Sequence, residues 1–286
     1  MTGRSVELVL SPFGADARAM VAAAVAAEDA GLAGVWTFDH LTGSMLGRGW
    51  SREPFSVLGA MATATEAVRL GPMVANMMNR HPVQLAVAMA TVQSLSAGRA
   101  VLGLGAGAAP GSAFAGEHGA IGITLLDSPG RRRRLAETVA AYDAVWQGEP
   151  SYRAAGPDGS AVTYAGLDHL VGPEPRPPVI IGAGSLATLY IALDWADGVN
   201  LLAGPRLAEL ADRVVEDDRT GQAGGFEVTV FVEAGAERDG GARGWSTAFS
   251  HPAVTSVLVG IRPPYDHALI AELGGLGGPT PRSSGP

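Results

Sequence analysis

Apolar residues along this chain fall into short runs that alternate with longer amphipathic stretches. The short runs have the aliphatic and β-branched composition of buried strands, and the longer stretches have helical spacing, several of them begun by Pro or ended by Gly. The predicted strands cover residues 6–14, 34–41, 69–77, 99–107, 178–184, 199–204, 226–235 and 253–261. The predicted helices cover residues 15–31, 53–68, 82–98, 131–146, 185–198, 205–218 and 265–275.

This alternation predicts an α/β fold of the (β/α)₈ TIM-barrel type, because eight strands in regular exchange with helices have the count and size of such a barrel. A doubly wound sheet also alternates, but it rarely needs eight strands. The C-terminal half is short, since residues 236–252 leave little room for a helix. We expect a single domain over residues 1–275 and a flexible tail over 276–286. Residues 108–127 follow no clear pattern, and the Pro- and Gly-rich residues 148–178 predict a hairpin or an excursion.

The composition of the chain then excludes several classes of catalytic and binding site. The chain has no Cys, which excludes disulfides, thiolate zinc sites and Cys nucleophiles. It also has no Lys, so Schiff-base aldolases, pyridoxal-phosphate enzymes and the P-loop lysine are excluded. The net charge of −8 gives nucleic-acid binding no general support. No apolar run reaches the ~20 residues of a membrane span, and no signal-peptide pattern begins the chain, so we expect a cytoplasmic protein.

Because the ligands of a barrel bind where its strands end, the residues at the predicted strand ends are the candidates for function. Asp39 and His40 end the second strand and Asn76 ends the third. An acid and an imidazole at the end of a buried run are costly unless something pairs with them. They are either a satisfied structural pair or a reactive group at the barrel rim.

Two Gly-rich turns, at 103–107 and 182–184, end the fourth and fifth strands. The second runs into a helix, where free N–H groups, Ser185 and Thr188 could hold a phosphate, although plain tight turns fit equally well. The first lacks the pattern of a nicotinamide-binding turn. The four arginines at 131–134 favour a solvated helix face or local ion pairs over a phosphate site.

Other uses of a barrel receive little support. A metal hydrolase needs several His and carboxylates at strand ends, and of the six His only His40 lies cleanly at one. We therefore predict no metal site. His81 more simply borders the third helix. Paired acids for glycoside cleavage are missing from the expected strand ends.

Three segments together resemble the bacterial luciferase-like superfamily of flavin- and deazaflavin-dependent oxidoreductases. They are "GVWTFDHLTG" at 34–43, "RLGPMVANMMNRHPVQLAVAMATVQSLSAGRAVLGLGAG" at 69–107 and "PPVIIGAGSLATLYIALDWADGVNLL" at 177–202. The resemblance implies a barrel that binds the deazaflavin coenzyme F420 or, as the alternative, FMN. The "FDHL" at 38–41 favours the deazaflavin branch, in which hydride passes between the coenzyme and a small organic substrate.

The resemblance also implies roles for particular residues. His40 would be the general acid or base, and Asp39 would orient it or contact the ring. A non-proline cis peptide near Met73–Val74 would back the ring, with Asn76 nearby. Ala106 and Gly107 would pass along the cofactor. Gly182, Ala183, Gly184 and Ser185 would hold its phosphate.

Some features depart from the family or stay open. Some relatives of this type carry a Glu where this chain has Ala108, so a catalytic acid is missing there. Glu117 and His118 fit a plain surface loop as well as a substrate contact, and Trp50 could line a substrate lid. The alternatives are an FMN-dependent monooxygenase, which would need a flavin reductase, and a non-catalytic barrel that binds a partner. The family resemblance also suggests a homodimer.

Overall fold

The computed structural model describes residues 4–154, 162–217, 225–235 and 247–276. The strands of the main sheet are β1 (Ser5–Leu10), β2 (Gly34–Thr37), β3 (Arg69–Pro72), β4 (Ala75–Asn76), β5 (Leu102–Gly105), β8 (Val179–Ala183), β9 (Gly198–Leu202), β10 (Glu227–Glu233) and β11 (Ser256–Ile261). The helices are α1 (Ala17–Asp29), α2 (Pro54–Ala64), α3 (Pro82–Leu95), α4 (Ala115–Ala120), α5 (Ser128–Trp146), α6 (Leu186–Trp195), α7 (Leu207–Val215) and α10 (His267–Gly274). A 3₁₀ turn, η1, covers Ser44–Leu46.

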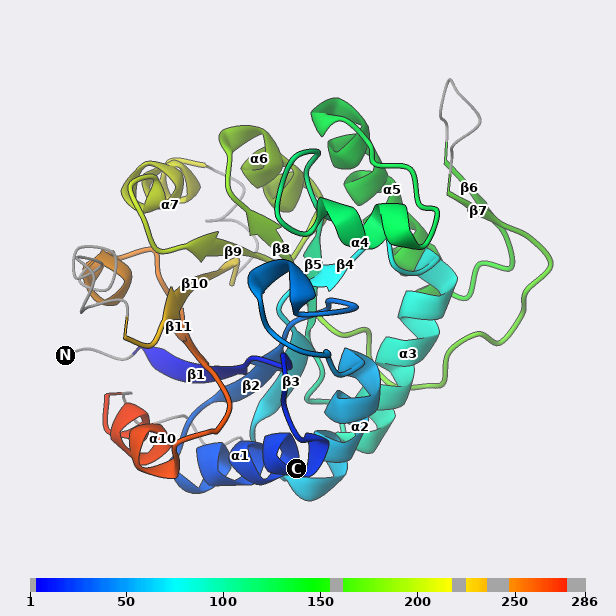
Figure 1. Cartoon of the computed structure of the whole chain (residues 1–286). Coiled ribbons are helices and arrows are strands. Elements are labelled where there is room, and N and C mark those ends of the chain that lie inside the picture. The colour runs from blue at the N-terminus through cyan, green and yellow to red at the C-terminus, as the bar shows by residue number, and fades with distance from the viewer. Residues whose placement is uncertain (1–3, 155–161, 218–224, 236–246, 277–286) are drawn as a thin grey trace.

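The strands form one parallel sheet in the order β3-β2-β1-β11-β10-β9-β8-β5-β4. The two edges meet, because Leu70 pairs with Ala100 and the amide of Val101 donates to the carbonyl oxygen of Leu70 at 2.9 Å. Figure 1 shows the resulting ring of strands with helices around its outside. The predicted (β/α)₈ barrel is confirmed.

The nine strands fill eight positions of the barrel, because β3 and β4 are two parts of the third predicted strand. The peptide bond between Met73 and Val74, which separates the two parts, is cis. This is where the family resemblance places such a bond. The interruption lies at the end of the barrel where the strands finish, and the amide of Met73 still donates to the carbonyl oxygen of Thr37 at 2.7 Å.

Most helices begin where the sequence supplies a side-chain cap. Asp16, Glu53, Asp127, Ser185 and Asp266 each accept a backbone N–H of the following turn. His81 does the same for α3 and forms a capping box with Gln84, so its role at the border of that helix is confirmed.

The core has two layers, as a barrel requires. The larger layer lies between the strands and the surrounding helices, where Leu135, Val139 and Tyr142 of α5 are fully buried and Trp146 is partly buried. The smaller layer contains Trp36, which is 1% exposed, together with Met73 and other strand residues. Trp36 is therefore a core residue.

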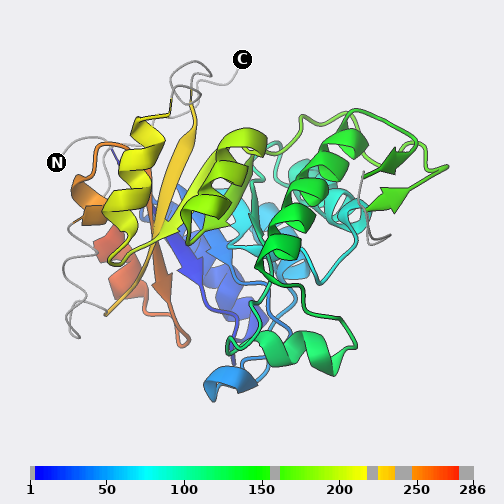
Figure 2. The same cartoon turned by 90° about the horizontal axis from the view of Figure 1, so that it is seen from above.

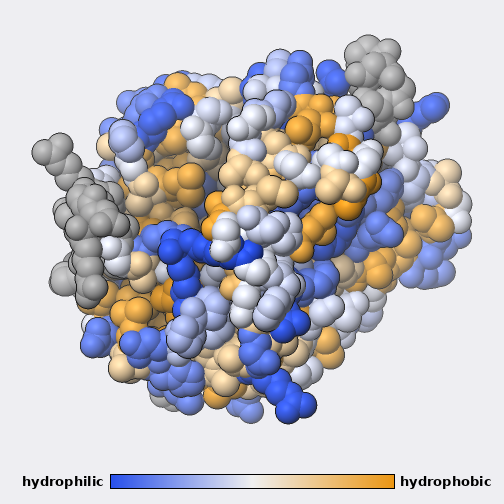
Figure 3. Space-filling view, in the orientation of Figure 1, coloured by the Kyte–Doolittle hydropathy of each residue, from blue (hydrophilic) through white to orange (hydrophobic). Residues whose placement is uncertain are grey.

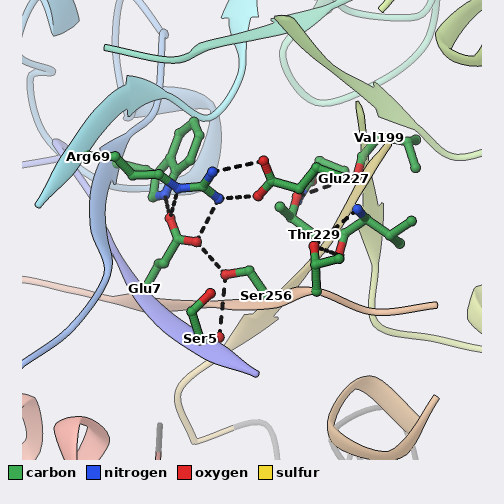
Figure 4. Close-up of polar contacts among 11 residues, drawn as sticks. Ser5, Glu7, Arg69, Val199, Glu227, Thr229 and Ser256 are labelled. Carbon is green, nitrogen blue, oxygen red and sulfur yellow. Dashed lines mark hydrogen bonds and ion pairs between the residues drawn. The ribbon is translucent and has the colours of Figure 1, made fainter. Parts of the chain in front are cut away.

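Polar groups close the N-terminal end of the barrel, as Figure 4 shows. The guanidinium of Arg69 on β3 forms ion pairs with Glu7 of β1 and Glu227 of β10. Glu7 is fully buried and also accepts hydrogen bonds from Trp36 Nε1 at 2.6 Å and from the hydroxyl of Ser256. Buried carboxylates need such partners, so this cluster is part of the scaffold.

Two excursions extend from the barrel. The short strands β6 (Tyr152–Arg153) and β7 (Thr163–Tyr164) pair antiparallel and confirm the predicted hairpin, which projects beyond α5 in Figure 1. The second excursion contains α4 (green) and η1 (blue), which lie beyond the strands in Figure 2. The sequence offers no helix between residues 108 and 127, so α4 corrects that interpretation.

Some predictions fall on residues outside the described ranges. They are residues 277–286 of the expected tail and residues 236–246 of the segment between the last two strands. The end of that segment is described, and its residues 247–250 form a helical turn. The division into a domain of 1–275 and a tail therefore stays a prediction. Within the described ranges, no helix combines the length and apolar character needed to cross a bilayer.

Candidate functional site

A cavity of about 630 Å³ opens at the C-terminal ends of the strands, and all of the predicted site residues line it. Those residues are Asp39, His40, Met73, Val74, Asn76, Ala106, Gly107, Gly182, Ala183, Gly184 and Ser185. They come from four strand ends that are far apart in the sequence, and the closed barrel brings them together. The cavity is within the size range of small-molecule and cofactor sites.

Asp39 is an anchor within this site. Its carboxylate is 2% exposed and accepts the backbone N–H of Asn76 at 2.8 Å and a guanidinium N–H of Arg80 at 2.6 Å. These bonds tie the end of β2 to the end of β4 and to the segment before α3. Asp39 makes no hydrogen bond to His40, so the structure gives no direct support to the expectation that Asp39 orients His40. Its contact with a cofactor ring stays a prediction.

The carboxylate that holds His40 belongs to Glu117 of α4. Glu117 Oε2 lies 3.0 Å from His40 Nδ1, and Glu117 Oε1 accepts the backbone N–H of Thr42 at 3.0 Å. Glu117 is 3% exposed, whereas the side chain of His40 is 24% exposed. The imidazole therefore faces the cavity while its acidic partner is buried. Of the two interpretations left open for Glu117, the plain surface loop is wrong.

His118 extends this network behind the cavity. It is 1% exposed, and its Nε2 lies 3.0 Å from the Nδ2 of Asn76, which donates to it. Burial lowers the pKa of His118, against the opposing effect of the Glu117 carboxylate. The ring is consequently kept neutral, with its proton on the buried Nδ1, for which the structure shows no partner in the described residues.

Aromatic rings form one wall beside His40. The ring of Phe114 stacks on the imidazole with centroids 3.7 Å apart and planes 25° from parallel. Phe13 lies 5.7 Å from His40, and Phe38 and Phe231 line the cavity deeper in the barrel. Figure 3 shows polar and apolar residues interspersed over this face of the molecule. Trp50, which is 62% exposed, is not among the residues that line the cavity.

The glycines of the site have different reasons to be glycine. Gly107 has a φ of 73°, and a Cβ there would lie 2.9 Å from Asn76 Oδ1. At Gly184 a Cβ would meet no protein atom within 4 Å, so it would project into open space at the cavity wall. A group with a phosphate fits this bare backbone, because Ser185 begins α6 beside it and the first amides of that helix are free of helical partners.

The arginine run at the start of α5 has two kinds of member. Arg131 lines the cavity and donates to the carbonyl oxygens of Ala106 at 3.1 Å and Gly107 at 2.7 Å, which fixes the turn after β5. Arg132 also lines the cavity. Arg133 lies 3.9 Å from Glu137 on the same helix. The prediction of local pairs thus holds for Arg133 but misses the role of Arg131.

Comparisons with known proteins identify the family of this chain. The family model of the luciferase-like monooxygenases matches residues 2–236. The chain belongs to the luciferase-like monooxygenase family. The F420-dependent glucose-6-phosphate dehydrogenase of Microbacterium testaceum is 30% identical over 188 residues, which are 63% of this chain and 51% of that protein.

A second curated protein and a solved structure are also similar to this chain. The 5,10-methylenetetrahydromethanopterin reductase of Archaeoglobus fulgidus is 30% identical over 219 residues, 74% of this chain and 59% of that protein. A solved F420-dependent secondary alcohol dehydrogenase, in complex with an F420–acetone adduct, superposes with a TM-score of 0.71 at 15% identity over 95% of this chain and 97% of that one. The chain thus spans little more than half the length of these curated relatives.

The structure also reveals what sequence reasoning missed. From one short segment, Phe114 lines the cavity while Glu117 and His118 bond to the cavity residues His40 and Asn76, although the sequence around them looks irregular. Their spacing of three and four residues is that of one helical face, and this was the available signal. No group of three or more metal-binding side chains occurs among the residues that the structure describes.

Proposed function

We propose that this chain is an F420-dependent oxidoreductase that transfers hydride between the deazaflavin and a small organic substrate. The observation that carries the proposal is that the cofactor residues expected from the family line one cavity together with His40, which Glu117 holds from behind. The curated relatives support the choice of cofactor, since one is an F420-dependent dehydrogenase. A location in the cytoplasm and assembly as a homodimer stay predictions.

The residues present fit such a cofactor. The bare backbone at Gly182–Gly184 and the start of α6 would hold its phosphate, and the interrupted strand at Met73 and Val74 would support its ring, with Asp39 and Asn76 beside it. When bound, the deazaflavin supplies the redox chemistry by accepting or returning a hydride at a substrate carbon.

His40 would accept or donate the proton that accompanies hydride transfer. Its Nδ1 is engaged by Glu117, so Nε2 is the nitrogen that can serve a substrate in the cavity. As a substrate such as an alcohol is oxidised, its carbon loses a hydride, its oxygen loses a proton to His40 Nε2, and a carbonyl forms. Reduction runs the same exchange in the opposite direction. The phenylalanine wall favours a substrate with an apolar group beside the reacting carbon.

A binding titration tests the proposal first. The purified protein is titrated with F420 and, separately, with FMN, and quenching of tryptophan fluorescence is followed. We expect tight binding of F420, followed by turnover with members of a panel of alcohols, imines and alkenes. His40→Ala should retain F420 binding and lose about 10²- to 10⁴-fold in kcat, the usual contribution of a general acid or base.

The other outcomes identify the alternatives. Binding of FMN alone would support a monooxygenase of the same fold, which would need a flavin reductase. Binding of neither cofactor would contradict the proposal and favour a non-catalytic binding protein. Unchanged turnover in His40→Ala would remove His40 from the mechanism.

A further inference from the structure

The acid that some relatives place after the fourth strand is absent here, because that position is Ala108. A buried carboxylate nevertheless lies behind the cavity wall, where Glu117 of α4 contacts His40. Residues 114, 117 and 118 lie on one face of this segment, so Phe114 stacks on His40 from the same element that carries Glu117. The imidazole is thus held by a stacked ring and by a carboxylate.

The contacts of Glu117 assign a direction to each hydrogen bond. The backbone N–H of Thr42 can only donate, so it occupies Glu117 Oε1. An ionised carboxylate has no proton to donate, so Glu117 Oε2 accepts from His40 Nδ1, which then carries the proton. In the neutral ring the lone pair consequently lies on Nε2, the nitrogen available to the cavity.

We infer that Glu117 is the positioning residue of this site, which selects the tautomer of His40 in which Nε2 is a free base. The same logic operates wherever a buried acid orients a catalytic histidine. The inference rests on the proposed function for its catalytic consequence. Its structural part, the choice of tautomer, is a property of the protein alone and can be measured without any cofactor.

Glu117→Gln tests this assignment because an amide has only one oxygen. That oxygen will accept the N–H of Thr42, since an amide NH₂ there would oppose another donor. The NH₂ group then faces His40 Nδ1 and donates to it, which moves the imidazole proton to Nε2. We expect the ¹⁵N chemical shifts of His40, in cofactor-free protein at a pH where the ring is neutral, to report Nδ1–H in the wild type and Nε2–H in the variant.

Activity provides the second readout. With F420 and a substrate found in the panel, Glu117→Gln should lower kcat by about 100-fold or more while F420 binding changes little, because the base would be in the wrong tautomer. Glu117→Asp, which keeps the carboxylate, should recover part of the loss. The signal of His40 is assigned by its absence in His40→Ala.

Asp212→Asn is the matched control. Asp212 Oδ1 lies 3.0 Å from His251 Nε2, so this pair has the same length and the same kinds of group, and neither residue lines the cavity. Its substitution should leave the ¹⁵N shifts of His40 and the kcat unchanged.

Different results would overturn the inference about the tautomer and the proposed function. An Nε2–H tautomer in the wild type would overturn the inference, and this measurement remains decisive even if Glu117→Gln does not fold. Retention of Nδ1–H and of kcat within twofold in Glu117→Gln would also overturn it. If the tautomer inverts but the wild type shows no turnover with F420, the positioning of His40 stands and the proposed function fails.

Discussion

Asp39 and His40 are neighbours in the chain but serve different partners. The carboxylate of Asp39 accepts from the amide of Asn76 and from Arg80, so it joins two strand ends. The imidazole of His40 instead contacts Glu117, which is 77 positions away, and faces the cavity. Both residues follow the end of β2 and line the cavity, and their different partners are why one is structural and the other can be reactive.

His118 makes the stability of the protein sensitive to mild acid. Because burial lowers its pKa in the folded chain, the unfolded chain binds a proton more readily. The stability that neutral His118 contributes is complete above its ordinary pKa of 6.5 and is lost as the pH falls from there toward the lowered value. We expect His118→Gln, whose amide oxygen can still accept from Asn76, to lose less stability between pH 7 and pH 5.

Urea unfolding at several pH values measures this difference. The charged or titratable groups that act on His118 are Glu117, His40, Arg131 and Asp39, and all are retained in the variant. Equal losses of unfolding free energy in both proteins would show that His118 does not titrate in this window.

At the scale of elements, the glycines of β5 explain how the interrupted strand fits. A Cβ at Gly103 would run into the carbonyl oxygen of Pro72, and one at Gly105 would run into the side chain of Val74. Both positions are two apart and therefore lie on the same face of β5. These glycines serve the close packing of β5 against β3 and β4, whereas Gly184 leaves space at the cavity.

Two glycine substitutions separate these roles. Gly103→Ala should lower the free energy of unfolding by about 3 kcal/mol, the upper end for overpacking, because backbone must move. Gly184→Ala should change it by less than about 0.5 kcal/mol, yet weaken F420 binding about tenfold by filling the cofactor space. Chemical denaturation and the fluorescence titration measure both effects, and a stable Gly103→Ala protein with normal binding would refute the packing argument.

At the scale of the whole molecule, the Arg69 cluster joins distant parts of the chain across the barrel floor. Arg69 on β3 contacts Glu7 on β1 and Glu227 on β10, and Glu7 also bonds to Ser256 on β11. Figure 4 shows these side chains converging from separate strands. They lie at the opposite end of the barrel from the cavity, so they affect closure and not chemistry.

Removal of this guanidinium should destabilise the entire barrel. Arg69→Met leaves the fully buried Glu7 without its cation, which should cost about 3–5 kcal/mol of unfolding free energy. Arg213→Met is the control, since Arg213 pairs with Glu216 on the surface and should matter by less than about 1 kcal/mol. F420 binding measured under conditions where Arg69→Met is folded should be unchanged, and a loss of binding with normal stability would contradict this division of roles.

Much of the barrel can be predicted from the sequence because its signals are local. Each strand run and each capped helix is specified by neighbouring residues, and the order of eight such units permits few other folds. The predicted strands are longer than the observed ones, since residues such as Phe38 and Asp39 leave the ladder to line the cavity. The irregular composition of residues 108–123 hides α4, because six residues are too few for a clear periodic pattern.

The amino-acid sequence is enough to specify the alternation of strands and helices, and with it the strand ends at which Asp39, His40, Asn76 and Gly182–Ser185 lie. These features depend on local periodicity and on the rule that parallel strands finish at one face. The acid that holds His40 is known only from the folded chain, because Asp39 is adjacent in the chain but Glu117 is adjacent in space. That choice depends on how the β5–α5 connection folds over the cavity, which no local pattern encodes.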